Sequence, residues 1–337
     1  MSVNIGNISL AHGVMLAPMA GYTDRAMRLV CHEEGCELSV TEMVSAKAVV
    51  YEDKKTFSLA KILPDEGPVA IQIFGSEPEI MAEAAARLSR PTVGARPVAI
   101  DINMGCPVHK IFSNGEGSAL MRSPELIEKI VGAVKGAVDI PVTAKIRAGI
   151  DESSINAVEC ALAAESGGAS MICIHGRTRV QMYGGKADRE IIKNVKQSLQ
   201  IPLFANGDIT SAADAISMIS DTNADGIAVG RGAVGNPFLF SEIICAMNGE
   251  SFSEVSIERR AETALRQLRV AIEDKGERVA IPEARKQIAL YLHGFRGASA
   301  LRAKINASTT YAEVEAAFAE ILKEQQKRRK SAEFSEF

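Results

Sequence analysis

The chain has 337 residues, of which 47% are hydrophobic and 24% charged, with a net charge of −4. These values are typical of a soluble globular protein, argue against disorder except at the ends, and suit one large domain with an appendage or two domains. No apolar run approaches the roughly 18 residues of a membrane span, and no basic region followed by a long apolar stretch marks a secretory signal. Six cysteines form no Cys-x-x-Cys pair and have no zinc-ligand spacing, so we expect no metal and reduced thiols in a cytoplasmic protein.

Short runs rich in β-forming residues recur along the first 230 residues. Each run is nearly continuously apolar, as expected of parallel strands that are buried on both faces. The predicted strands are residues 14–17, 38–43, 69–74, 97–103, 141–146, 170–175, 201–205 and 226–229.

Helical patterns lie between these strands. One covers residues 78–88, with Ser76 as its predicted N-cap, and another opens with Pro124 at its first helical position. Eight alternating units within about 240 residues predict an α/β fold, a (β/α)8 TIM barrel. The competing fold is a doubly wound open sheet, which would want a glycine-rich turn after the first strand, and residues 17–21 do not supply one.

The pattern changes after Phe240. Residues 249–253 read as a linker, and helical periodicity dominates from Ser256 onward. We therefore expect a catalytic barrel in residues 1–248, a C-terminal all-α domain in residues 249–330 and a loose tail in residues 331–337. The sequence does not determine an oligomeric state, and a monomer is compatible with it.

Charge is distributed unevenly between these segments. Residues 251–337 carry 16 Lys/Arg and 13 Asp/Glu, a balance of +3, which leaves −7 on the first 250 residues. The basic residues of the tail either form a solvated face or make a patch that contacts phosphates.

A thiol stands directly after the fourth predicted strand, on the turn Gly105-Cys106-Pro107. Proline fixes such a turn and cannot extend a central strand, so Cys106 is expected to face whatever binds at the carboxyl end of the strand. The alternative is that Cys106 behaves as one more half-buried cysteine, because free cysteine is commonly a small hydrophobe.

Polar residues stand at the carboxyl end of nearly every predicted strand, either in its last residues or directly after it. A purely structural barrel would not need them. Active sites of such barrels lie at the carboxyl ends of the strands. These positions are Pro18-Met19-Ala20, Glu42, Gln72, Asn103 with Cys106, Lys145 with Arg147, His175 with Arg177, Asn206-Gly207-Asp208 and Gly230-Arg231-Gly232.

The last two strand ends predict a phosphate site. Gly207, Gly230 and Gly232 leave backbone N–H groups open, and Arg231 adds a charged, forked donor. The alternative is that the glycines only make tight turns.

Gln72, Lys145 and His175 suit a flat heterocycle above that phosphate. An amide can read its edge through a donor and an acceptor together. A lysine can stabilise negative charge on a reduced ring, and His175 could do the same, pair with phosphate, or be a satisfied core histidine.

In order and spacing, the first 240 residues resemble the tRNA-dihydrouridine synthases, flavin-dependent reductases of uridine in tRNA. The motifs that carry this resemblance are Ala17-Pro18-Met19-Ala20-Gly21-Tyr22-Thr23-Asp24, Thr41-Glu42-Met43, Gln72-Ile73-Phe74-Gly75, Asp101-Ile102-Asn103-Met104-Gly105-Cys106-Pro107, Lys145-Ile146-Arg147, His175-Gly176-Arg177-Thr178, Asn206-Gly207-Asp208-Ile209 and Gly230-Arg231-Gly232. The tail resembles the small helical RNA-binding domain of the family. Its residues 285–291 are similar to the Arg-Lys-His-x-x-Trp-Tyr stretch of the bacterial B-type enzymes, from which Gln287 and Leu290 depart.

The resemblance implies a cofactor, a reductant and a substrate: flavin mononucleotide (FMN), NADPH and tRNA. It implies that Cys106 donates a proton and that Asn103 and Arg177 hold the uracil and a neighbouring phosphate. The residues expected to bind FMN include the phosphate-site and ring-facing residues described above. They are Pro18, Met19, Ala20, Gln72, Lys145, His175, Asn206, Gly207, Asp208, Gly230 and Arg231.

Two other functions remain open from the residues alone. A flavin barrel enzyme that acts on a small heterocycle, of the dihydroorotate or dihydropyrimidine type, would explain the barrel and the cysteine but not the basic helical tail. A non-catalytic RNA-binding or regulatory protein would explain the tail, although it would have no need of Cys106, Lys145 and Arg231.

Overall fold

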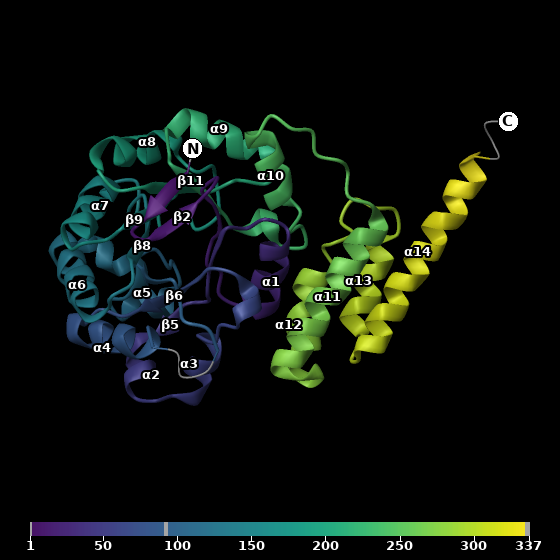
Figure 1. The fold of residues 1–337 in the computed structure, drawn as a ribbon, viewed down its shortest axis with the longest axis horizontal. Helices are drawn as coiled ribbons and strands as arrows, with labels where there is room; N and C mark the ends of the chain where they lie inside the picture. The colour runs from purple at the N-terminus through teal and green to yellow at the C-terminus, as the bar shows by residue number, and fades with distance from the viewer. Residues whose placement is uncertain (1, 91–93, 334–337) are drawn as a thin grey trace.

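The alternating strands and helices close into a parallel barrel (Figure 1). The structure, a computed structural model, describes residues 2–90 and 94–333. Within these residues the strands are β1 (Val3–Ile5), β2 (Ile8–Leu10), β3 (Val14–Leu16), β4 (Leu38–Val40), β5 (Val44–Ser45), β6 (Val69–Phe74), β7 (Ala99–Asn103), β8 (Val142–Arg147), β9 (Met171–His175), β10 (Leu203–Asn206) and β11 (Gly226–Val229). The barrel runs β3-β4-β6-β7-β8-β9-β10-β11, and β11 pairs with β3 to complete the circle. The predicted (β/α)8 barrel is therefore confirmed.

Helices surround the barrel and then form a separate bundle beside it (Figure 1). The α-helices are α1 (Arg25–Glu33), α2 (Ala46–Val50), α3 (Lys54–Leu59), α4 (Pro78–Leu88), α5 (His109–Ser113), α6 (Pro124–Ala137), α7 (Ala157–Ser166), α8 (Arg189–Ser198), α9 (Ala212–Thr222), α10 (Leu239–Met247), α11 (Ile257–Lys275), α12 (Glu277–Ile288), α13 (Ala298–Ala307) and α14 (Tyr311–Glu333). Three 3-10 helices are η1 (Pro64–Glu66), η2 (Gly117–Arg122) and η3 (Arg231–Ala233). None of the described helices is both long and apolar enough to cross a membrane.

Five predicted strands differ from the observed ones by one or two residues at an end, as where residues 201–205 become β10 (Leu203–Asn206), and two further differences concern β4 and α4. The run 38–43 divides, because β4 ends at Val40 and the chain re-enters the sheet only as the two-residue β5. Helix α4 is capped at Glu77 rather than Ser76, and no side-chain hydrogen bond closes that end.

Strand alternation sorts the side chains of the barrel into two sets. On β7, Ile100 and Ile102 pack into the apolar layer under the helices. Asp101 and Asn103 therefore point to the interior of the barrel, since successive residues of a strand face opposite sides. The β1–β2 hairpin packs Val3 and Ile5 into an apolar cluster with Met15 and Phe204, so the amino end of the barrel is closed and the carboxyl end is left for a ligand.

The C-terminal helices have a core of their own. Helices α11 to α14 bury a cluster that includes Leu268, Ile288, Tyr291 and Phe318, and Phe238 from the end of the barrel belongs to it. Helix α14 continues to Glu333, so residues 331–333 are helical and not a loose tail. The rest of that expected tail, residues 334–337, lies outside the described residues.

Helix α11 lies against α1, the first helix of the barrel (Figure 1). Ala26 and Leu29 of α1 share an apolar cluster with Val270, Ala271 and Ala280 of the helical bundle. The two domains therefore bury apolar surface against each other.

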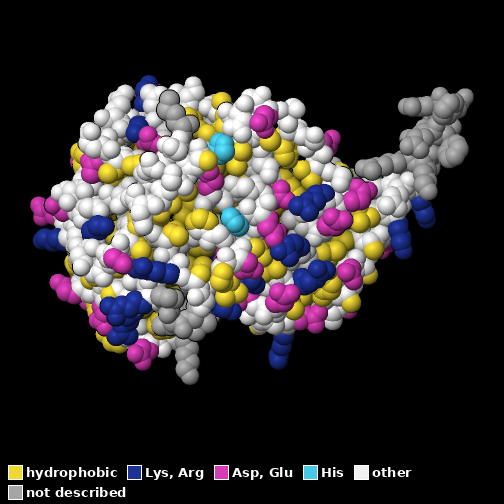
Figure 2. Space-filling model, in the orientation of Figure 1, with side chains coloured by type: hydrophobic (Ala, Val, Ile, Leu, Met, Phe, Trp, Pro, Cys, Tyr) yellow, Lys and Arg dark blue, Asp and Glu magenta, His cyan; other side chains and the backbone are white. Residues whose placement is uncertain are grey.

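Ion pairs reinforce this interface. Arg259 pairs with Glu34 at 2.9 Å, Lys275 pairs with Asp24 at 2.7 Å, and Arg266 pairs with Glu33. These three basic residues hold the domains together, so they do not belong to a free basic patch. Over the bundle surface seen in Figure 2, Lys and Arg side chains are interspersed with Asp and Glu.

We expect a shortened chain of residues 1–248 to be much less stable than the full chain. Its truncation would uncover Leu29 and Phe238, and each large apolar side chain returned to water costs about 1.5–3 kcal/mol. Urea unfolding measures the difference, and a chain ending at Glu333 is the control that should match the full chain. Equal unfolding midpoints for residues 1–248 and the full chain would contradict this role of the interface.

Candidate active site

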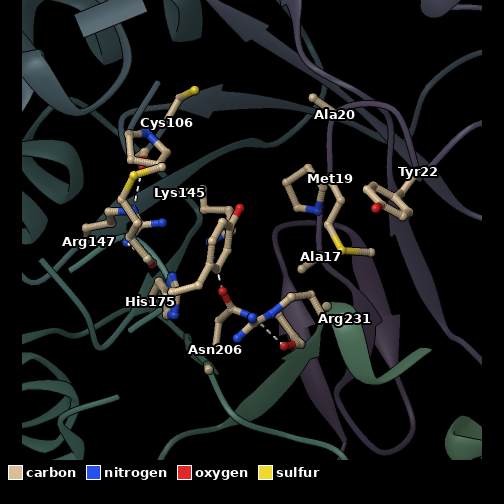
Figure 3. A pocket seen from close by; sticks show the side chains of 18 of the residues that line it. Ala17, Met19, Ala20, Tyr22, Cys106, Lys145, Arg147, His175, Asn206 and Arg231 are labelled. Carbon is tan, nitrogen blue, oxygen red and sulfur yellow. Dashed lines mark hydrogen bonds between the residues drawn. The ribbon is translucent and has the colours of Figure 1, made fainter. Parts of the chain in front are cut away.

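A cavity of about 830 Å³ opens at the carboxyl ends of the barrel strands. Cys106, Arg147 and His175 lie on one side of it, and Ala17, Met19 and Tyr22 lie on the other (Figure 3). The site residues predicted from the sequence that line this cavity are Pro18, Met19, Ala20, Gln72, Asn103, Cys106, Lys145, His175, Asn206, Gly207, Asp208, Gly230 and Arg231. Arg177 is the one predicted residue that does not line it.

The turn that carries Cys106 is held from three directions. The backbone N–H of Cys106 donates to Asn103 Oδ1 at 2.9 Å, its carbonyl accepts from Ser118 Oγ at 2.8 Å, and Arg147 Nε donates to the Gly105 carbonyl at 2.8 Å. Burial raises the pKa of the Cys106 thiol, although a backbone hydrogen bond involving Val108 and the charge of Arg147 oppose this effect. The thiol therefore keeps its proton at neutral pH.

Two amides stand between this turn and the floor of the cavity. Asn103 Nδ2 donates to Gln72 Oε1 at 2.8 Å, and its other near neighbour is the Met43 sulfur at 3.5 Å. An amide nitrogen carries two hydrogens. One N–H of Asn103 thus has only a weak sulfur acceptor and is available to a ligand.

Lys145 lies at the centre of the cavity and contacts Asn206 (Figure 3). Its Nζ donates to Asn206 Oδ1 at 3.0 Å, and Asn206 Nδ2 donates to the Ala228 carbonyl at 2.7 Å, which fixes the orientation of the amide. Burial lowers the pKa of Lys145, and the neighbouring Arg147 adds to the effect, whereas Cys173 and Asp101 oppose it. The only hydrogen-bond partner of its ammonium group within the described residues is the neutral Asn206, and Lys145 lines the cavity.

His175 is a neutral imidazole of defined tautomer. Arg177 Nη1 lies 3.2 Å from His175 Nε2, and because a guanidinium can only donate, Nε2 accepts and Nδ1 carries the ring proton. Burial, together with the charges of Lys145 and Arg147, lowers the pKa of His175 to about 2. His175 therefore presents a neutral donor among cations.

Arg177 lies behind the cavity wall in this structure, and its contact with the substrate stays a prediction. Its side chain is buried, and it donates to both carboxylate oxygens of Asp208 at 2.7 and 2.9 Å and to the carbonyls of Gly184 and Gly185. With these bonds and the one to His175, each of its three nitrogens has a partner behind the cavity wall. Arg177 thus contacts two residues that line the cavity, Asp208 and His175.

The loops after β10 and β11 form a cationic cradle. Arg231 is 57% exposed and lies 4.0 Å from Asp208. Burial alone would raise the pKa of Asp208, but hydrogen bonds from Ala187 and Arg177 and the charges of Arg177 and Arg231 lower it. A Cβ added at Gly230 would meet no protein atom nearer than 3.7 Å and would project into the open cradle. The exposed cation and the open backbone fit a phosphate group.

The other predicted glycines have different reasons. A Cβ at Gly232 would lie 2.2 Å from the Ile209 carbonyl, and one at Gly207, where φ is +131°, would lie 2.6 Å from the Ala187 side chain. These two glycines allow loops to pack closely, as the alternative of tight turns supposed. Gly230 has open space instead, and its part in a phosphate site stays a prediction.

Several cavity residues were missed as site residues. Tyr183 is 53% exposed, and the guanidinium carbons of Arg231 and Arg147 lie 4.6 and 5.9 Å from its ring centre. Met182, Val108 and Tyr22 also line the cavity from loops, where no periodicity marks a functional position. The helical domain contributes Leu290, so the cavity is completed by both domains.

The comparisons with known proteins agree with one another. The dihydrouridine synthase family model matches residues 15–327. A probable tRNA-dihydrouridine synthase of Rickettsia bellii is 40% identical over 306 residues, which are 90% of this chain and 93% of that protein. The tRNA-dihydrouridine synthase B of Pseudomonas putida is 38% identical over 308 residues, covering 91% of this chain and 90% of that protein.

Solved structures share the barrel at low sequence identity. The 6-hydroxypseudooxynicotine amine oxidase of Pseudomonas geniculata N1 has a TM-score of 0.58 at 12% identity and covers 74% of this chain and 49% of that chain. Morphinone reductase has a TM-score of 0.52 at 13% identity and covers 77% of this chain and 91% of that chain. These two likenesses concern the fold.

The neutral His175 should make the folded state sensitive to acid. A free histidine titrates near pH 6.5, so between pH 6.5 and about 2 the unfolded chain binds a proton that folded His175 does not. This contribution to stability is complete above pH 6.5 and is lost as the pH falls. We expect His175→Asn to flatten the fall of unfolding free energy between pH 7 and pH 5 by up to about 1.4 kcal/mol per pH unit. Urea unfolding at several pH values measures it, and parallel curves for the two proteins would contradict the assignment.

Proposed function

The chain belongs to the dihydrouridine synthase family, which makes it an oxidoreductase, and on that premise we propose that it reduces the 5,6 double bond of uridines in tRNA. We propose FMN as its cofactor and NADPH as the reductant that restores reduced FMN. A cytoplasmic location, where reduced thiols and tRNA coexist, goes with this proposal; all six cysteines are free in the described residues.

One arrangement carries the proposal: the Cys106 thiol, whose pKa burial raises, lines the same cavity as the exposed Arg231 and the open backbone at Gly230, which suit a phosphate. Saturating the uracil double bond needs a hydride at carbon 6 and a proton at carbon 5. Reduced FMN would supply the hydride. Cys106 supplies the proton as a general acid, which its raised pKa keeps available at neutral pH.

The chain's own donors suit the uracil. Asn103 has one N–H that faces no strong acceptor. Arg147 lines the cavity; its Nε and Nη1 donate to backbone carbonyls, which leaves Nη2 for a ligand. Both match the carbonyl oxygens of a pyrimidine. Because Asn103 also fixes the backbone of Cys106, the group that binds the base and the group that protonates it keep a constant separation.

The residues that would hold FMN lie on the other walls. Arg231 and the open backbone at Gly230 suit its phosphate. Lys145 suits negative charge on the reduced ring, because its ammonium group has a neutral hydrogen-bond partner and little water around it. Pro18, Met19 and Ala20 supply a wall that is mostly apolar.

Substrate size argues for RNA. A uridine in folded RNA must leave its stack to enter a cavity of this depth, so the enzyme needs binding surface around the mouth. The helical domain reaches that mouth through Leu290. We therefore propose that residues 249–330 help to dock tRNA. Loops of the barrel that carry cations would add to this surface; one of them holds Arg179, whose guanidinium carbon lies 3.7 Å from the ring centre of Phe112.

The proposed function is tested with purified protein, FMN, NADPH and an unmodified tRNA transcript, with dihydrouridine measured by mass spectrometry. Wild type should form dihydrouridine and leave free uracil and orotate unchanged. Cys106→Ala should keep its flavin and lower the rate by about 10²–10⁴, the usual contribution of a positioned acid. Cys245→Ala, outside the cavity, is the control. Reduction of the free bases without RNA would favour the small-heterocycle alternative, and a wild-type rate in Cys106→Ala would remove the thiol from the mechanism.

Flavin retention tests the phosphate cradle. Arg231→Ala removes an exposed guanidinium whose charge-assisted hydrogen bond is worth roughly 1.5–3 kcal/mol, so the FMN dissociation constant should rise about 10-fold to 100-fold. Equilibrium titration followed by flavin fluorescence measures it. Arg189→Ala, which removes an ion pair with Asp221 away from the cavity, should bind FMN as wild type does. Unchanged affinity in Arg231→Ala would place the phosphate elsewhere.

A further inference from the structure

A carboxylate lies buried inside the barrel, just beneath the cavity, and the proposed mechanism does not use it. Asp101, on β7, is 2% exposed and does not line the cavity. One oxygen accepts from Gln72 Nε2 at 2.6 Å and the other from Thr143 Oγ1 at 2.5 Å. A buried carboxylate without a directly bonded cation is an unfavourable choice for packing alone.

Strand register brings these three residues together. Gln72 pairs with Asp101 across β6 and β7, and Asp101 pairs with Thr143 across β7 and β8. All three side chains therefore lie at one level of the barrel interior. One level higher, Asn103 lies beside Gln72 and reaches the turn of Cys106.

The hydrogen bonds in this chain have a defined direction. Burial raises the pKa of Asp101, and the hydrogen bonds from Thr143 and Gln72 and the charge of Lys145 oppose this effect. Both carboxyl oxygens accept in the structure, so Gln72 turns its NH2 group toward Asp101 and its oxygen toward Asn103. Asn103 must then turn its NH2 group toward Gln72, which leaves Asn103 Oδ1 to accept from the backbone N–H groups of Cys106 and Gly105 at 2.9 and 3.2 Å. If Gln72 flipped, its NH2 group would oppose that of Asn103, and each flip would force the next.

We propose that Asp101 is a positioning residue that orients the amides of Gln72 and Asn103 and thereby holds the turn of Cys106. Its role in uridine reduction rests on the proposed function, whereas its effect on the turn does not. Because both amides line the cavity, Asp101 also determines that they offer spare N–H donors, and not oxygens, to a bound ring.

Three single variants separate orientation from simple packing. Asp101→Leu removes the acceptor of Gln72. Asp101→Asn keeps it, because its oxygen can accept from Gln72 while its NH2 group donates to the hydroxyl of Thr143. Thr143→Val is the matched control, since it removes the other hydrogen bond of the same carboxylate and leaves the bond to Gln72 intact.

The readout that does not depend on activity is the rate at which iodoacetamide alkylates Cys106, followed by peptide mass spectrometry with Cys245 as internal reference. Cys106 should be alkylated at least about 5-fold faster in Asp101→Leu, because Asn103, which accepts from the backbone of the turn, loses its fixed orientation. The same variant should form dihydrouridine about 10-fold to 100-fold more slowly. Asp101→Asn and Thr143→Val should stay within about 3-fold of wild type, even where urea unfolding shows that they are less stable.

The double variant Asp101→Asn with Thr143→Val covers the case in which Asp101→Leu does not fold. In the double variant the amide introduced by Asp101→Asn no longer has the Thr143 hydroxyl that selects its orientation. The alkylation rate of Cys106 should therefore increase by more than the product of the two single effects. Three results would overturn the proposal. The first is an equal alkylation rate in Asp101→Leu and Thr143→Val, and the second is an Asp101→Asn variant as impaired as Asp101→Leu. The third is a double variant whose effect is only the product of the two single effects. If wild type reduced no uridine, the proposed function would fail while the alkylation comparison still decided the role of Asp101.

Discussion

The closed register of the parallel strands is the constraint on which the rest of the structure depends. Because β11 pairs with β3, the eight carboxyl ends form one ring, and side chains at equal register meet inside it. Gln72, Asp101 and Thr143 form one level, and Asn103 and Lys145 pair at the next. A shift of one residue on any of these strands would turn its polar side chains outward toward the helices.

The electrostatics of the cavity follow from this crowding. Lys145, Arg147 and Arg177 surround His175, whose pKa falls to about 2, so the imidazole stays neutral. Asp208 offsets part of the positive charge through its two-pronged bond with Arg177. What remains is a cavity rich in fixed cations and N–H donors, which suits a phosphate, a ring that gains electrons and the carbonyl oxygens of a pyrimidine.

The helical domain is part of the site as well as a neighbour of it. Gln287 Nε2 donates to the Tyr22 carbonyl at 3.3 Å, and the Lys286 ammonium lies 4.3 Å from the Tyr22 ring centre. Tyr22 follows the loop of Met19, and Leu290 lines the cavity directly. The helical domain is therefore in direct contact with the loop that carries Met19 and Tyr22.

The sequence by itself determined the barrel, the strand ends and most of the cavity wall. Continuous apolar strands and turn residues are local signals: Cys106 and Arg231 come shortly after their strands, and Lys145 lies near the carboxyl end of its own. Tertiary structure decided the rest. His175 is the last residue of β9 and Arg177 comes two residues later, yet Arg177 is buried behind the wall, where its long side chain reaches Asp208. Tyr183 and Leu290 carry no periodic signal, and only the folding of loops and the docking of a second domain bring them to the cavity. The direction of the Asp101 chain likewise depends on pairings between β6, β7 and β8, which are distant in sequence.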